Sequence, residues 1–257
     1  MLRTLMISAT GMSAQQTALD IISHNLANVN TTGFKSSQAN FADLFYQQVA
    51  PAEETDAAQP GGVGLGVSPA QVERSFTQGQ LQTTGNTLDL AVQGQGFFQV
   101  LRPDGSLGYT RDGSFSLNAE GVLCTAQGCP LVPEIRVPDD TSSILVGADG
   151  TVSVQRAGQS GAQAVGQLEL AGFMNPGGLE NLGHNLYAST VAAGDPMVNT
   201  PGQDGLGLMV QGSLERSNVN LVEEMVNLIL TQRAYEVNTK SIQAADEMMR
   251  MTNNLRR

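Results

Sequence analysis

Glycine and proline are confined to the middle of this chain of 257 residues. All 10 Pro and 27 of the 29 Gly lie between residues 46 and 214, which leaves only Gly11 and Gly33 outside. Both residue types disfavour helix interiors, proline by about 3 kcal/mol and glycine by about 1 kcal/mol relative to alanine. The two ends can therefore form long helices, and the middle cannot.

Charge divides along the same boundaries. The formal net charge is -11, while residues 1–45 and 215–257 each hold as many acidic as basic residues. The middle therefore carries the whole acidic excess, which argues against a nucleic-acid binder. No run of 18 apolar residues occurs, so we expect no membrane span.

Apolar residues recur at intervals of seven at both ends, a spacing that places them on one helix face and makes a coiled-coil seam. In the first helix the residues are Leu5, Met12, Leu19 and Leu26, with Ile22 on the same side. In the second they are Leu221, Leu228, Tyr235, Ile242 and Met249, and Val222, Met225 and Ile229 widen the stripe. We expect the first helix to end at residues 30–33 and the second to begin at Ser217 or Asn218.

Two interpretations of these helices stay open. They could cover a globular core, or they could pair antiparallel with each other and with neighbouring copies of the chain. Polar residues near the seam, such as Ser8 and Gln232, weaken an isolated pair and favour the second interpretation. Asparagines such as Asn25, Asn28 and Asn30 either cap helices or fix the register between subunits.

The middle has the signals of β-structure. Short apolar runs alternate with turn sequences that include Asp104-Gly105, Asp112-Gly113 and Asp149-Gly150, and Asp-Gly between apolar runs is a strong hairpin signal. We therefore predict an α+β fold, in which the two terminal helices form an antiparallel coiled-coil domain and a central, mainly-β domain of hairpins lies between them. The expected boundaries are 1–33 with 215–257 for the helices, 34–70 for a connecting segment with an extended arm at about 46–66, and 71–214 for the β domain.

Residues that could perform catalysis or bind a metal are scarce. Trp is absent and His occurs twice, and the acids Asp104, Asp112 and Glu120 lie in turn sequences that select acids anyway. We therefore expect no enzyme activity, no cofactor and no metal. Cys124 and Cys129 flank a short turn, and they either form a disulfide or are two small apolar residues.

Three parts of the chain resemble the bacterial flagellar rod and hook proteins. The first is residues 23–35, SHNLANVNTTGFK, and the second is residues 211–249, which begin QGSLERSNVNLVEEMVNLILTQRAYEVNTK. The third is the middle, at Gly79-Gln80-Leu81, at DLAVQGQGFFQV from Asp89 and at YTRDGSF from Tyr109. The length and the extra segment after Tyr46 resemble the distal rod member of that family.

This resemblance implies a structural subunit that polymerises into a rigid hollow shaft, which transmits torque from motor to hook and carries the export channel. It implies a polymer interface on the seam residues and asparagines named above. The implied partners are further copies, the proximal rod and hook subunits, the peptidoglycan and outer-membrane ring proteins and the flagellar type III export apparatus. It implies a basal body that spans the periplasm and export without a cleaved signal peptide, and the start of the chain has no apolar signal core.

Two alternatives remain at this stage. Within the same family, the chain could be a proximal rod or hook subunit. In a different class, it could be a secreted β-rich binding module, or a glycan-cleaving enzyme, that oligomerises through its terminal helices. The second alternative needs a concave site with convergent polar groups or a close pair of carboxylates.

Overall fold

The structure is a computed structural model that describes residues 2–48, 62–156 and 161–254. Its contacts divide the chain into two units, which we describe separately. The helical unit comprises 1–27, 37–74 and 220–257, and the β unit comprises 28–36 and 75–219. Residues 37–70, expected as part of a connecting segment, and 71–74, expected as the start of the β domain, are thus grouped with the helices. Most of the expected arm at 46–66 lies outside the described residues.

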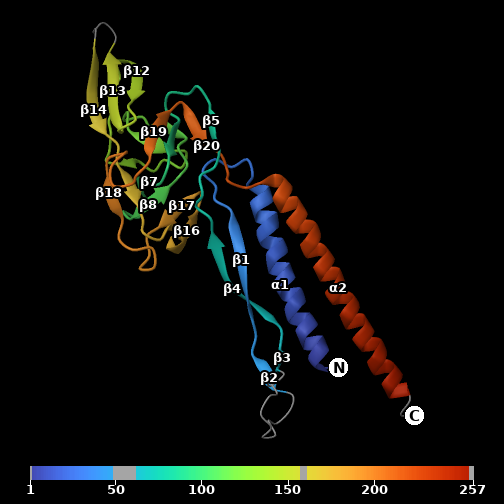
Figure 1. Cartoon of the computed structure of the whole chain (residues 1–257). Helices are drawn as coiled ribbons and strands as arrows, with labels where there is room; N and C mark the ends of the chain where they lie inside the picture. Colours follow the sequence, from blue (N-terminus) through green and yellow to red (C-terminus); the bar gives the residue numbers. More distant parts are fainter. Residues whose placement is uncertain (1, 49–61, 157–160, 255–257) are drawn as a thin grey trace. The chain divides into compact units, whose positions relative to one another are not determined.

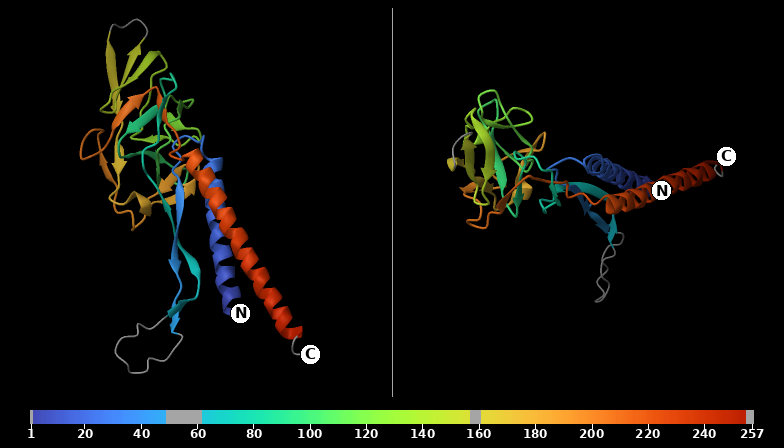
Figure 2. Two further views of the ribbon diagram at one scale, coloured as in Figure 1. Left: turned by 45° about the vertical axis from the view of Figure 1, so that its right-hand side comes forward. Right: turned by 90° about the horizontal axis from the view of Figure 1, so that it is seen from above.

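The helical unit contains two long helices and a narrow β-ribbon, drawn in blue, teal and red in Figure 1. In Figures 1 and 2, the two helices lie side by side. Strand β1 pairs antiparallel with β4, and β2 pairs antiparallel with β3. The elements are α1 (Leu2–Ala27), β1 (Ser37–Asp43), β2 (Tyr46–Gln48), β3 (Gly62–Gly64), β4 (Val67–Arg74) and α2 (Leu221–Asn254).

Both helices differ slightly from the expected bounds. Helix α1 ends at Ala27, and the turn that follows reaches Gly33, whose φ of 66° is the left-handed conformation expected of it. Helix α2 begins at Leu221 because Asn220 caps it: the Asn220 Oδ1 accepts a hydrogen bond from the amide of Val222 at 3.2 Å. Two glutamates follow in the first turn, where the positive end of the helix dipole favours them.

The β unit is built from short strands and one short 3-10 helix, η1. Its main sheet has the order β16-β17-β8-β7-β15-β18, with β11 also paired to β7, and a separate antiparallel sheet has the order β12-β13-β14. Three strand pairs complete the unit: β6 with β19, β5 with β20 and β9 with β10. The bounds are β5 (Leu81–Thr83), β6 (Leu90–Gln93), β7 (Phe97–Leu101), β8 (Leu107–Thr110), β9 (Phe115–Leu117), β10 (Leu123–Thr125), β11 (Leu131–Val132), β12 (Thr141–Val146), β13 (Thr151–Arg156), β14 (Ala162–Gln167), β15 (Leu170–Gly172), η1 (Pro176–Gly178), β16 (Glu180–Gly183), β17 (Leu186–Ala188), β18 (Met197–Asn199), β19 (Leu208–Gln211) and β20 (Ser213–Glu215).

Two apolar clusters hold the β unit together. The larger one gathers aliphatic side chains from β6, β7, β10, β11 and β15 around Phe98 and Phe115, whose rings meet edge to face at 5.1 Å. The smaller one is aromatic, with Phe97, Tyr109 and Tyr187 among its members. Successive residues of β7 point to opposite faces, so Phe97 belongs to one cluster and Phe98 to the other.

Most of the predicted hairpin turns are confirmed, and one is wrong. Asp104-Gly105 joins the paired strands β7 and β8, and Asp149-Gly150 joins β12 and β13. Asp112-Gly113 lies between β8 and β9, which do not pair with each other. Instead, the backbone at Gly113 lies against Leu90, where a side chain would collide with the Leu90 carbonyl. That glycine is needed for a close backbone approach rather than for a turn.

Candidate assembly surface

The contact between the two helices runs through small and polar residues. A Cβ atom added to Gly11 would lie 3.0 Å from the Asn238 side-chain nitrogen, and the Thr239 hydroxyl donates to the Met12 sulfur at 3.6 Å. Asn25, near the end of α1, donates to the Glu224 carboxylate at 2.8 Å, near the start of α2. The middle of α1 thus contacts the middle of α2, and the end of α1 contacts the start of α2.

Asn25 fixes this end of the helical unit. Its side chain is 2% exposed, accepts a hydrogen bond from the amide of Ser37 at 2.9 Å and donates to the Ser37 carbonyl at 2.8 Å. The paired bonds hold the start of β1 against α1, and the bond to Glu224 adds α2. Asn25 therefore joins α1, β1 and α2 within one chain.

Helix α2 carries a second apolar face that nothing in the described part of the chain covers. Its members are Val222, Val226, Leu230, Val237, Met248 and Met251, all exposed. At about 100° per residue, Val222, Val226 and Leu230 project roughly opposite the partly buried Leu228 and Ile242. A helix with apolar residues on two opposite sides needs a partner on each side.

The predicted interface residues fall into three groups by burial. Ile22 and Asn25 are buried inside the chain; Leu5, Met12, Leu19, Leu26, Asn28, Leu228, Ile242 and Met249 are partly buried; and Asn30, Leu221, Met225 and Tyr235 are exposed. The prediction that these residues contact other copies remains a prediction. The seven-residue spacing did not single out Val237 and Leu230, and it placed Val222 beside the seam, although these are the most exposed apolar side chains of α2.

The β-ribbon also presents apolar side chains to solvent. Phe41 on β1, Val72 on β4 and Phe45, just after β1, are exposed, and Phe45 is 87% exposed. The ribbon packs against α1 near Gly66, where a Cβ atom would collide with the Thr10 hydroxyl. Two-stranded ribbons are marginal in water without such packing.

A buried charge cluster lies in the β unit, and sequence reasoning missed it. The Lys35 Nζ lies 2.6 Å from Oε1 of Glu215, and an Arg111 guanidinium nitrogen lies 3.3 Å from Oε2. All three side chains are at most 4% exposed. Burial lowers the pKa of Lys35 even though the Glu215 carboxylate opposes that shift, and burial also lowers the pKa of Arg111.

The two cysteines are free thiols, both buried. Cys124 lies opposite Pro130 in an antiparallel bridge, and the amide of Thr125 donates to the Cys129 carbonyl at 2.9 Å. Because adjacent residues of a strand point to opposite faces, this register directs the two thiols to opposite sides of the hairpin. Burial raises the pKa of Cys124, so its thiol is a poor nucleophile.

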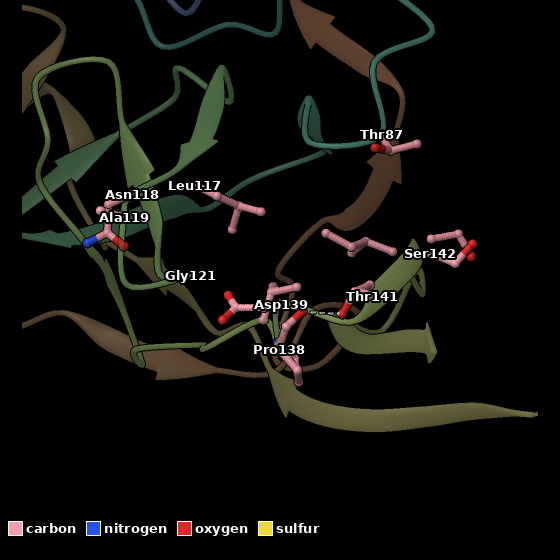
Figure 3. Close-up of a pocket in the computed structure, with 12 residues that line it drawn as sticks. Thr87, Leu117, Asn118, Ala119, Gly121, Pro138, Asp139, Thr141 and Ser142 are labelled. Atoms are coloured by element: carbon pink, nitrogen blue, oxygen red, sulfur yellow. Dashed lines mark hydrogen bonds between the residues drawn. The ribbon is translucent and has the colours of Figure 1, made fainter. Parts of the chain in front are cut away.

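A hollow of about 340 Å³ lies between the turn at 117–121 and the segment at 137–144. In Figure 3, Leu117 and Asp139 border it, and the Thr141 hydroxyl donates to the Pro138 carbonyl at 2.7 Å. The lining residues offer hydroxyl groups and one carboxylate but no aromatic ring. They therefore provide no stacking surface of the kind that holds a sugar, and no close pair of carboxylates.

The turn acids serve the turns that contain them. Asp104 accepts hydrogen bonds from the amide and hydroxyl of Ser106, which lower its pKa, and Asp112 accepts from Ser114 and Thr32. Among the described residues, no group of three or more His, Cys, Asp or Glu is placed to hold a metal ion. Over the same residues, neither helix is apolar enough for its length to cross a membrane.

Three family models match the chain. They are "Flagella basal body rod protein" at residues 5–35, "Flagellar hook protein FlgE/F/G D1 domain" at 91–154 and "Flagellar basal body rod FlgEFG protein C-terminal" at 210–255. The first match covers most of α1, the last covers α2, and the middle one lies within the β unit.

Curated relatives match over the full length. The flagellar basal-body rod protein FlgG of Buchnera aphidicola subsp. Schizaphis graminum is 48% identical over 99% of this chain and 100% of its own. FlgG of Agrobacterium fabrum is 45% identical over 96% and 97%, and FlgG of Borreliella burgdorferi is 43% identical over 100% of both chains. The chain belongs to the FlgG family of flagellar basal-body rod proteins.

Proposed function

We propose that this chain is the structural subunit of the flagellar distal rod, and that it polymerises through its helical unit into a rigid, hollow shaft. The shaft transmits torque from motor to hook and carries the export channel. The function is mechanical, and the subunit is not an enzyme. Full-length similarity to FlgG proteins supports this identity.

The observation that carries the proposal is the second apolar face of α2. Helix α1 contacts one side of α2, and the opposite side exposes aliphatic side chains over several turns. Leu230 is 61% exposed and Val222 68%. Burying one such side chain contributes about 1.5–3 kcal/mol, so a row of them supplies a strong drive to associate. A polymer of identical subunits provides the missing partner on every copy.

Within each subunit, α1 and α2 form an antiparallel coiled coil. The pairings of Asn25 with Glu224 and of Met12 with Thr239 support opposite helix directions. The partly buried residues Leu228, Ile242 and Met249 keep the seven-residue spacing of a seam. Small and polar residues elsewhere in that seam make the pair weak alone, so assembly completes it.

The β unit forms the outer layer of the rod, and its acidic composition keeps that layer soluble and free of unwanted contacts. Other partners are the proximal rod and hook subunits, the ring proteins of the peptidoglycan and outer membrane, and the type III export apparatus. The rod spans the periplasm, and the subunit is exported without a cleaved signal peptide. The arm at about 46–66 contributes to the stiffness that separates a rod from a hook.

The test uses two variants that each add one acid to α2. Leu230→Glu places a carboxylate on the exposed apolar face, where the monomer tolerates it but a packed interface does not. Gln243→Glu adds the same charge at an exposed α2 position that is already polar and belongs to neither the predicted seam nor the exposed apolar face. Each variant replaces the native gene, and basal bodies are examined by electron microscopy.

We expect Leu230→Glu to give truncated rods without hooks and Gln243→Glu to give complete ones. Circular dichroism of the purified variants serves as the folding control. Complete basal bodies in cells that carry only Leu230→Glu would refute the assembly face. Complete basal bodies with hooks in cells that lack the gene altogether would refute the rod assignment itself.

A further inference from the structure

Three pieces of chain that are distant in sequence lead out of the β unit. They are residues 28–36, which follow α1; the piece from residue 75, which follows β4; and the piece that ends at residue 219, just before α2. Each is short, and none lies within a long strand. Hydrogen bonds and ion pairs between these three pieces therefore determine how well this edge of the β unit is ordered.

Glu215 joins all three pieces at once. Its Oε1 accepts hydrogen bonds from Lys35 Nζ at 2.6 Å and from the amide of Gly79 at 2.8 Å. Its backbone carbonyl accepts a hydrogen bond from the amide of Gly33 at 2.8 Å. Lys35 in turn donates to the Thr77 carbonyl at 2.7 Å, so the first and second pieces also contact each other directly.

The charges of Lys35, Arg111 and Glu215 require the three side chains to be buried together. One buried carboxylate faces two buried cations, because Arg111 lies 3.3 Å from the other carboxylate oxygen. Arg111 has two further acceptors, the carbonyls of Val92 and Gly94, but its buried Nε has no hydrogen-bond partner among the described residues. Without Glu215 in place, neither cation has a counter-charge, and burying an unpaired cation is costly.

Asn218 adds a second bond set across the same pieces. Its Oδ1 accepts a hydrogen bond from the amide of Ser36 at 2.7 Å, and its Nδ2 donates to the Ser75 carbonyl at 2.9 Å and to the Thr77 hydroxyl at 2.9 Å. The last piece of the β unit therefore holds the first two through a charged residue and an amide three positions apart. Both sets form only when that last piece is docked.

We infer that Lys35, Arg111 and Glu215 form a clasp that closes this edge of the β unit in one cooperative step, and that docking of residues 213–218 is the event that closes it. Until that piece docks, the two earlier pieces stay loose, because Lys35 and Arg111 cannot be buried together without the carboxylate. The clasp thus couples the ordering of the piece after α1 to that of the piece before α2. This inference concerns a single chain and does not depend on the proposed function.

The test is amide hydrogen exchange of the purified full chain, comparing wild type with Glu215→Gln. The substitution keeps the shape of the side chain and removes its charge. Loss of one partner of a buried pair corresponds to an acceleration of about a hundredfold or more in the opening that permits exchange. We expect the amides of Gly33, Ser75 and Gly79, one or more from each of the first two pieces, to accelerate by a common factor.

Two internal comparisons sharpen the result. Glu134→Gln removes the carboxylate of an exposed ion pair with Arg136, and it should leave exchange unchanged. Peptides from the sheet β12-β13-β14 report global unfolding and should stay protected in both variants. Acceleration confined to Gly79, which bonds the altered carboxylate directly, would overturn the clasp.

A double-mutant cycle with Lys35→Met separates charge from packing and covers the case in which Glu215→Gln folds poorly. Adding Lys35→Met to Glu215→Gln removes one of the two unpaired cations, so we expect it to restore at least about tenfold of the lost protection. If Lys35→Met accelerates exchange by the same factor in wild type and in Glu215→Gln, the two residues act independently, and the inference is overturned. Failure of the double variant to regain any protection or folded structure would overturn it too.

Discussion

Replacing Gly113 with alanine should destabilise the β unit far more than the local backbone conformation suggests. Gly113 does not have a positive φ, so alanine is allowed there and would ordinarily stabilise the chain by about 0.4–1 kcal/mol. The added Cβ atom, however, would overlap the carbonyl oxygen of Leu90. The two backbones must therefore separate, and the sign of the effect reverses.

The structure gives the size of the loss. Separation breaks the hydrogen bond from the Leu90 amide to the Gly113 carbonyl at 3.0 Å and the bridge between Asp89 and Ser114. Leu90 is 1% exposed, so water does not replace the lost partners. Each buried group left without a partner costs about 1–3 kcal/mol, which gives a total of about 4 kcal/mol for two such bonds.

The assay is thermal unfolding of purified Gly113→Ala, with Gly105→Ala as its control. Gly105 has a φ of 81° and nothing within 4 Å of an added Cβ, so its substitution isolates backbone strain, which costs about 1–2 kcal/mol. For a domain of this size we expect Tm to fall by roughly 10 °C for Gly113→Ala and by a few degrees for Gly105→Ala. Equal shifts in Tm would refute the reasoning, because the Leu90 contact would then contribute nothing.

Two further predictions concern titratable groups in the β unit. Burial lowers the pKa of Lys35 from its ordinary value of 10.5. As the pH approaches that value from below, the folded state binds fewer protons than the unfolded state, so the free energy of unfolding should rise with pH. The difference in unfolding free energy between wild type and Lys35→Met, measured by equilibrium denaturation at several pH values, should show the rise. A flat difference would contradict it. Cys124 and Cys129 should both titrate as thiols, slowly in the native protein and fast in denaturant, and the absence of titratable thiols in protein purified without reductant would instead establish the disulfide.

The sequence predicts the coarse architecture because glycine and proline act locally. Their absence from α2 and near absence from α1 leaves long helices as the favoured structure there, and turns such as Asp104-Gly105 specify hairpins within a few residues. The same local rule is wrong at Asp112-Gly113, because glycine is needed there for the close approach of the Leu90 carbonyl. Only the folded chain brings Leu90 near this position. Local signals therefore find elements and fail where a distant backbone sets the requirement.

The buried charge cluster lies beyond such rules. Lys35, Arg111 and Glu215 belong to residue types that are almost never fully buried without a partner, so each alone predicts a solvated position. Their pairing depends on long-range contacts that no spacing encodes. One weak signal exists: Lys35 is one of only two lysines in the chain, and the other is Lys240.

The terminal helices show why a periodic pattern locates a helix more readily than its partners. In α2, Leu228 and Ile242 of the seven-residue pattern are partly buried, but the pattern does not include Val226 and Leu230. It also places Val222 beside the seam, although Val222 lies four residues before Val226 and projects to the same side as Val226 and Leu230. A helix that is apolar on both sides has no single stripe, so its periodicity is weak although its burial in an assembly is extensive. Weak periodicity in a long, apolar helix therefore indicates that the helix packs on two sides, as expected of a subunit in an assembly.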